Sequence, residues 1–311
     1  MYGKKFLLLL AIATAIALYS CQKDEDMKDQ GTLRVEMTDA PIDDANVEAV
    51  FVTVADLKAD GASVEGFSKT TIEVSALQNG LTELLCNTQL DAGSYSKIAL
   101  VLDYAADESG AAPGCYVVDA AGLKHQLLSQ AGEIEIAHDF TVASGQQTSL
   151  VLDFDLRKCL VKEEGGADGY DFVTKAELEQ ALRVVAKANC GIVKGACSDL
   201  LTSSDKIVVY AYKKGTFSKE LEIQGQGESK VQFANAVTSA AIGADGKFEL
   251  HFLEADEYEL HFCSYEENAN GEMELQGLLA LNVLNSINLG SITVGASASV
   301  TVEVLVTGLL P

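Results

Sequence analysis

Short stretches in which apolar and polar residues alternate run through the first part of the chain and predict β-strands. In residues 32–37, Leu33, Val35 and Met37 alternate with polar neighbours, which is the pattern of a strand with one buried face. Residues 47–57, 96–104, 133–142 and 148–156 have the same character, and Gly-bearing turns separate them. Residues 38–41 (TDAP) predict a turn, because Asp39 can bond the backbone just downstream and Pro41 restricts its own φ.

Helical signals are few. Thr174 and Glu177 have the spacing of a capping box and predict a helix over residues 175–185. A shorter helical turn is expected within residues 75–85. We therefore expect at most one or two short helices in this part of the chain.

After Cys190 the strand pattern starts again. Seven further strands at short spacing are typical of an all-β sandwich; they are predicted over residues 191–197, 206–215, 230–237, 246–253, 257–265, 278–284 and 298–311. The fold class expected is mainly β, with two tandem β-sandwich domains of Greek-key or transthyretin-like type over residues 31–188 and 189–311. The boundary is placed near residues 187–190.

One six-residue frame occurs in both halves. Residues 90–95 (LDAGSY) and 253–258 (LEADEY) share leucine, an acid, alanine and a final tyrosine, each ahead of an alternating strand. A tyrosine entering a strand after a tight corner often bonds the backbone with its hydroxyl. Tyr95 and Tyr258 are therefore predicted to occupy equivalent corners.

The N-terminus has the pattern of an export signal. Lys4 and Lys5 precede an apolar run, Phe6–Leu18, which is shorter than the roughly 20 residues that a membrane-spanning helix needs. The run ends in Leu-Tyr-Ser-Cys, which resembles the lipobox of bacterial lipoproteins and implies a lipid on Cys21. An ordinary signal peptide with a chance cysteine is the alternative.

These signals predict a signal peptide over residues 1–20 and a flexible acidic tether over residues 21–30. Residues 23–26 (KDED) are similar to the tag that exports some lipoproteins to the outer face of the outer membrane. The expected localisation is therefore the outer membrane, lipid-anchored and exposed at the cell surface, with palmitate among the expected acyl groups.

The charge of the chain excludes one large class of partner. It carries 46 acidic and 22 basic residues, a net charge of −24 at pH 7. Phosphate backbones would repel such a chain, so nucleic-acid binding is not expected.

Cysteine chemistry adds little. None of the cysteines Cys86, Cys115, Cys159, Cys190, Cys197 and Cys263 forms a C-x-x-C pair. The sequence does not give the disulfide pairing of these cysteines. If residues 190–197 are one strand, however, Cys190 and Cys197 lie about 23 Å apart and cannot be bridged.

Four motifs resemble a known family when taken in order. LRVEMTDAP, LQNGLTELL, LDAGSYSKIALVL and LVLDFDLRK are similar to motifs of bacterial surface lipoproteins built on a TDAP-motif domain of unknown function. The resemblance covers about residues 31–188 and departs near ALRVV, where that family has a proline-bearing strand. ADGKFELHFLEADEY resembles transthyretin-like and carboxypeptidase-regulatory-like sandwiches. The resemblance implies an exported, anchored β protein and supplies no activity or site residues.

Candidate catalytic residues have a simpler explanation. Asp153 and Asp155 lie two apart on one predicted strand face and form a carboxylate pair of the kind that glycosidase chemistry uses, while Leu152, Phe154 and Leu156 occupy the other face. We interpret the aspartates as the solvent side of a half-buried strand, and we expect no catalytic residues.

Two candidate metal sites arise. His251 and His261 would lie opposite each other if their strands form a hairpin, and would be separated if the corner at Tyr258 sends the second strand to the other sheet. Glu266, Asn268, Asn270 and Glu272 alternate around Gly271 like a calcium loop, although the twelfth position is Gly277 rather than an acid; a plain hairpin loop is the alternative. No cofactor other than such a structural calcium ion is expected.

The expected function is non-enzymatic binding or adhesion at the cell surface, toward a glycan or an extracellular protein. The alternatives are a fimbrial-type structural subunit, with Arg34 as a processing site, and an accessory protein or enzyme of polysaccharide processing.

Overall fold

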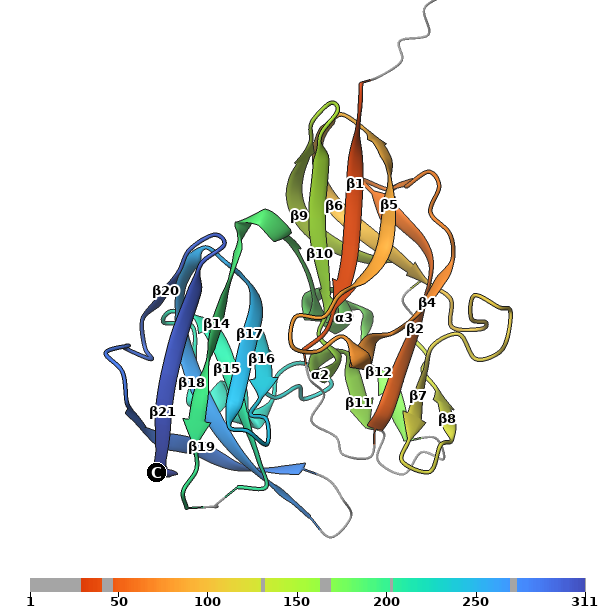
Figure 1. The fold of residues 1–311 in the computed structure, drawn as a ribbon. Coiled ribbons are helices and arrows are strands. Elements are labelled where there is room, and N and C mark those ends of the chain that lie inside the picture. The colour runs from red at the N-terminus through yellow and green to blue at the C-terminus, as the bar shows by residue number, and fades with distance from the viewer. Residues whose placement is uncertain are drawn as a thin grey trace, which may run out of the picture.

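The fold is mainly β and consists of two β-rich halves that lie side by side (Figure 1). The computed structural model describes residues 29–40, 47–129, 132–162, 169–201, 204–268 and 273–310. Here the first half means residues 29–189 and the second half residues 190–310. That each half is an independent domain stays a prediction.

Two sheets pack face to face in the first half. One sheet has the order β13 (Leu182–Ala186), β10 (Gln147–Phe154), β1 (Gln30–Thr38) and β5 (Glu83–Asp91), and β1 runs parallel to β10. The other has the order β8 (Lys124–Gln126), β7 (Tyr116–Asp119), β2 (Val47–Ala59), β6 (Gly93–Leu102) and β9 (Ile134–Val142), with β3 (Ala62–Ser63) and β4 (Thr70–Glu73) also paired to β2. Their inward apolar positions form one continuous core. The strands predicted in this half are confirmed.

Short elements link the end of β10 to the second half. They are α2 (Leu156–Cys159), β11 (Leu160–Lys162), β12 (Tyr170–Phe172), α3 (Lys175–Ala181) and the 3₁₀ turn η2 (Lys187–Asn189). The capping box is confirmed, since Thr174 and Glu177 bond each other's backbone. The helix ends at Ala181, however, because Leu182–Ala186 pairs with β10 as β13. The turn expected within residues 75–85 is found only in part: the 3₁₀ turn η1 (Val74–Ala76) ends at Ala76, and β5 begins at Glu83.

The second half wraps one long sheet around its core. The order is β16 (Thr238–Ala241), β15 (Lys206–Lys213), β18 (Asp256–Glu267), β19 (Met273–Val283), β21 (Ser299–Leu309), β14 (Cys190–Ser198) and β17 (Lys247–Glu254), with β20 (Ile292–Val294) on β18. A second apolar cluster lies on the outer side of β15 and β18, where Phe233 and Ala236 cover Tyr210 and Tyr212. The helix α4 (Lys219–Gln224) precedes this covering segment.

The strand predicted at residues 230–237 is wrong. These residues form turns, with Lys230 and Phe233 at positive φ. Buried Glu222 of α4 explains the difference, because its side chain accepts hydrogen bonds from the backbone and side chain of Asn235, and its carbonyl accepts from the Phe233 N–H. Tertiary bonds to one buried acid override the local strand pattern.

The two corner tyrosines are confirmed as equivalent. Tyr95 donates its hydroxyl to the Asp91 carbonyl at 2.7 Å, and Tyr258 donates to the Glu254 carbonyl at 2.9 Å. In both cases the acceptor is the acidic residue of the shared frame. The sequence echo therefore reflects the same local hydrogen bond in both halves.

Candidate functional site

The surface at which the two halves meet, which we call the seam, contains most of the buried charge. Asp153 and Asp155, predicted to face solvent, are each 2% exposed, so that prediction is wrong. Strand β10 lies between β1 and β13, and Phe252 of β17 packs on Val151 and Val185 beside it. The face of β10 that alternation leaves for solvent is covered by the second half.

Asp153 is paired within the sheet and linked across the seam. Arg183 lies directly opposite it on β13, and its Nε donates to Asp153 Oδ2 at 3.0 Å. The same guanidinium donates to the Phe252 carbonyl of the second half at 2.8 Å. Burial raises the pKa of Asp153 even though Arg183 opposes that shift.

A second group of charges surrounds α2. Asp155 Oδ2 lies 3.1 Å from both Arg157 and Lys158, and all three side chains are buried. Burial acts to raise the pKa of Asp155, but the two cations outweigh it and hold that pKa below its usual value. Burial lowers the pKa of Lys158.

Both cations of this group bond the second half through its backbone. Arg157 Nη1 donates to the carbonyls of Gln232 and Phe233 at 2.9 and 3.0 Å. Lys158 Nζ donates to the Ala236 carbonyl at 2.6 Å. The acceptors belong to the turn segment that covers β15.

Glu177 supplies the acidic counterpart of these contacts. It accepts from the backbone N–H of Ser229 at 2.9 Å and from its hydroxyl at 2.7 Å, while also completing the capping box of α3. These bonds help to hold its pKa below the usual value despite burial. One side chain thus caps a helix and joins the halves.

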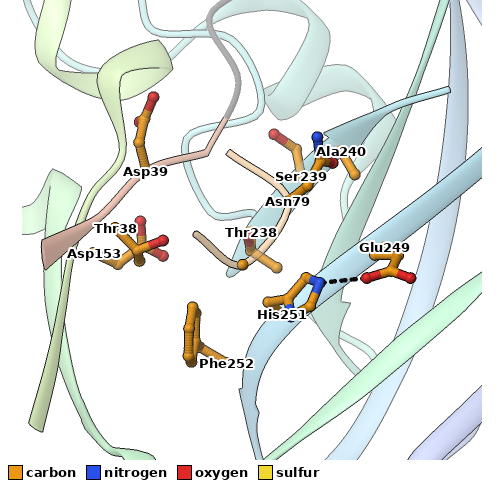
Figure 2. Close-up of a pocket in the computed structure, with 11 residues that line it drawn as sticks. Thr38, Asp39, Asn79, Asp153, Thr238, Ser239, Ala240, Glu249, His251 and Phe252 are labelled. Carbon is orange, nitrogen blue, oxygen red and sulfur yellow. Dashed lines mark hydrogen bonds and ion pairs between the residues drawn. The ribbon is translucent and has the colours of Figure 1, made fainter. Parts of the chain in front are cut away.

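A small cavity lies in the seam between Asp39, Asp153, Ser239 and His251 (Figure 2). Its volume is about 20 Å³, enough for one water molecule and too small for a substrate. Asp39 accepts from the Leu156 N–H at 3.0 Å, and burial, together with Asp155 and Asp153, raises its pKa well above the usual value. Among the described residues, Asp39 Oδ2, Asp153 Oδ1 and Ser239 Oγ have no hydrogen-bond partner.

The histidines are separated, as in the second of the two alternatives, although β17 and β18 belong to one continuous sheet. His251 lies on β17, which pairs with β14, and His261 lies on β18, which pairs with β15. His251 contacts Glu249 at 2.7 Å, whereas His261 stacks on Phe217 with 3.7 Å between ring centroids. The corner at Tyr258 separates them.

The calcium-loop prediction stays a prediction. Glu266 is exposed and the Asn268 side chain donates to Glu274 at 2.9 Å, while Asn270 and Glu272 lie outside the described residues. Within the part of the chain that the structure describes, no group of three histidine, cysteine, aspartate or glutamate side chains is placed to hold a metal ion. Cys21 also lies outside the described residues.

The described cysteines are all buried thiols. None of these six cysteines (Cys86, Cys115, Cys159, Cys190, Cys197 and Cys263) is in a disulfide, and Cys190 and Cys197 lie near opposite ends of the single strand β14. Burial raises the pKa of Cys86 and Cys190 to about 11. Such thiols have little nucleophilic thiolate at neutral pH.

Sequence reasoning missed the seam because half of its partners are backbone groups. The available signal was the clustering of charges in residues 153–158, together with Arg183, in a segment otherwise rich in apolar residues.

Among the described residues no helix is long and apolar enough to cross a membrane.

Comparison with known proteins gives a partial family match. Residues 30–173, less than half of the chain, match the family described as Domain of unknown function (DUF4382). No protein with a curated description matches the sequence.

Several solved structures are similar to the chain at low identity. The Bacillus anthracis TIE protein is 10% identical over 89% of this chain, at a TM-score of 0.19, and a leucine-rich repeat protein from Bacteroides thetaiotaomicron is 14% identical over 89%, at 0.20. This chain spans only 34% and 27% of those two proteins. GBS52, the minor pilin of Streptococcus agalactiae, is 12% identical over 89% of this chain and 97% of its own, at 0.23. Scores this low carry no inference about this chain.

Proposed function

We propose that the chain is a lipid-anchored protein of the outer cell surface that acts by binding or adhesion rather than by catalysis. The observation that carries the proposal is the use of the buried charges. Asp153, Asp155, Arg157, Lys158 and Arg183 engage one another and backbone carbonyls, and the cavity beside Asp153 holds no more than one water molecule. These groups stabilise the contact between two β-rich halves.

A polysaccharide-processing enzyme is the rival from another class. Glycosidases need two carboxylates that flank a sugar-sized cleft. Asp153 and Asp155 are instead covered by the second half, so their substitution would test folding more than chemistry. The direct test is turnover of polysaccharide by the intact protein, and sustained hydrolysis would contradict the proposal.

The anchoring part of the proposal has its own experiment. Cys21→Ala should move the protein from the membrane fraction to the soluble fraction and abolish metabolic labelling with palmitate, whereas Ser20→Thr should retain the label. Equal labelling and fractionation of Cys21→Ala and the wild type would contradict it. Replacing residues 23–26 by alanine should leave anchoring intact and protect the protein from external protease.

A fimbrial-type subunit is the second candidate, and one observation favours it. Strand β1 lies between β10 and β5, so loss of its first part, up to a cut at Arg34, would open a groove with a strand on each side. Arg34, half-exposed on β1, is the place for a processing cut. Cleavage there should then produce polymers that resist detergent, and Arg34→Ala should abolish them. A cleaved protein that stays monomeric would remove this candidate.

A further inference from the structure

A second, larger cavity opens on the surface of the seam, and we call it the seam groove. Its volume is about 340 Å³, within the range of pockets that hold small ligands or single peptide side chains. One wall is β11 of the first half, and the other is the segment 229–233 of the second half. Pockets at the junction of two folded units are frequent binding sites.

The charged residues that line the groove are basic, whereas the chain as a whole is acidic. Its lining contains Arg157, Lys162 and Lys230 and, among the described residues, no acid, although the chain has 46 acidic and 22 basic residues. The Arg157 side chain is largely buried and engages Asp155, and both Lys162 and Lys230 are exposed. The two lysines therefore give the opening a local positive charge that favours a carboxylate-bearing ligand.

The first-half wall is the edge of a small sheet. Among the described strands β11 pairs only with β12, and β12 contacts β8 on its other side. Figure 1 shows β11 on the side of the second half. All three residues of β11 line the groove, so an extended chain in the groove would lie beside this strand.

The opposite wall is held in place before any ligand binds. Gln226 and Val231 form an antiparallel bridge across the turn that carries Lys230. Phe233 stacks on Tyr210 with 4.1 Å between ring centroids, and its carbonyl accepts from Arg157. A rigid wall reduces the entropy that binding costs.

The aromatic rings of the groove distinguish between classes of ligand. Tyr210, Phe233 and Tyr265 are 0%, 1% and 4% exposed, so none of them presents a flat face on which a sugar ring could stack. Most of the exposed lining is polar, and its aliphatic part comes from half-buried Leu160, Val161 and Met273. A strand edge, three aliphatic side chains and two exposed lysines together match a peptide better than a glycan.

We propose that the seam groove binds an extended acidic peptide segment whose aliphatic side chains alternate with carboxylates. Its backbone adds to the edge of β11, its aliphatic side chains lie on Leu160, Val161 and Met273, and its carboxylates pair with Lys162 and Lys230. This inference rests on the proposed binding function and names the class of its ligand.

The test uses the full chain and a fluorescent peptide, acetyl-(Glu-Val)₄-amide. Fluorescence anisotropy should show saturable binding that weakens as salt rises. The matched peptide acetyl-(Gln-Val)₄-amide should bind at least tenfold more weakly. Lys162→Glu and Lys230→Glu should each weaken binding of the acidic peptide about three- to tenfold. Lys247→Glu, at a lysine that is 73% exposed on β17, is the matched control and should not change it.

Each remaining outcome overturns the proposal. Equal affinity for the two peptides would remove the charge argument, and equal losses from Lys247→Glu and the groove variants would show non-specific attraction. Competition by oligogalacturonate at lower concentration than the peptide would reassign the groove to acidic glycans. No peptide binding by a protein that Cys21-dependent labelling confirms as anchored would remove this inference and leave the proposed function standing.

Discussion

The two halves contribute to the seam in different ways. The first half provides charged side chains, those of Arg157, Lys158, Glu177 and Arg183. The second half answers mainly with backbone groups, the carbonyls of Gln232, Phe233, Ala236 and Phe252 and the N–H of Ser229. The seam should therefore be sensitive to side-chain changes in the first half and tolerant of them in the second, provided that the backbone keeps its path.

The asymmetry has a structural origin. The charged side chains of the first half come from three elements at the surface that meets the second half: α2 carries Arg157 and Lys158, α3 carries Glu177 and β13 carries Arg183. The second half meets them with turns and with the register shift of β17 at Phe252, where carbonyls are not all used by a sheet ladder. Buried Glu222, which also accepts from the Tyr212 hydroxyl at 2.9 Å, fixes one of these turns.

The largest effect is expected from removing Arg183. Arg183→Met keeps much of the side-chain volume but leaves Asp153 buried without a cation and the Phe252 carbonyl without this donor. The free energy of unfolding should fall by about 3–5 kcal/mol, the usual cost of breaking a buried pair on one side. Urea unfolding measures it. Lys175→Met, which removes an exposed i,i+4 pair with Glu179, is the control and should cost less than about 0.5 kcal/mol. A loss below 1 kcal/mol for Arg183→Met would contradict the importance of the seam.

The pH dependence of the seam follows from Asp39. Burial raises its pKa in the folded state, so the folded protein binds this proton more tightly than the unfolded chain does. The stability contributed by the proton is complete below the unfolded pKa of about 3.9 and is lost as pH rises through the folded pKa, at up to about 1.4 kcal/mol per pH unit.

Asp39→Asn isolates this contribution, since the amide cannot ionise. The stability of the wild type minus that of Asp39→Asn should fall as pH rises from 4 upward. Asp119→Asn is the matched control of opposite sign, because the hydrogen bond from His125 lowers the pKa of Asp119. The stability of the wild type minus that of Asp119→Asn should grow as pH rises from acid to neutral. If the stability difference between the wild type and Asp39→Asn does not change with pH, the pKa of Asp39 is the same in the folded and unfolded states, which would contradict the prediction.

The asymmetry itself can be tested at one contact. Glu177→Ala removes the acceptor of two bonds from Ser229 and opens the capping box, and it should cost about 1–2 kcal/mol. Ser229→Ala keeps the backbone donor and loses only the hydroxyl, so it should cost about 0.5–1 kcal/mol. Equal losses in thermal or urea unfolding would show that the second half depends on its side chains as much as the first does.

The smallest expected effect compares the halves where they are alike. Tyr95→Phe and Tyr258→Phe each remove one corner hydrogen bond and keep the ring, and each should cost about 0.5–1.5 kcal/mol. Tyr258 is fully buried and Tyr95 only partly, so the loss should be larger at Tyr258. A larger loss at Tyr95 than at Tyr258, or no loss at either position, would show that the shared six-residue frame does not stabilise the two halves in the way proposed.

Local patterns in the sequence determined much of this protein. Alternation in residues 32–37 and 148–156 predicted β1 and β10, the Thr174–Glu177 spacing predicted a helix cap, and a six-residue frame predicted two equivalent corners. Each of these features is decided by contacts between residues close in sequence or by the side on which a strand is apolar. Such information is present in a single chain segment.

Only the tertiary structure decided the rest. Alternation correctly set Asp153 on the face of β10 opposite the core, but it could not reveal that the second half covers that face, or that Asp155 lies beyond the strand as the N-cap residue of α2. Nor could it show that Leu182–Ala186 completes a sheet with β10, or that Glu222 turns residues 230–237 away from a strand. In each case the deciding partner lies far along the chain and is often a backbone carbonyl, which every residue carries and which therefore leaves no mark in the sequence.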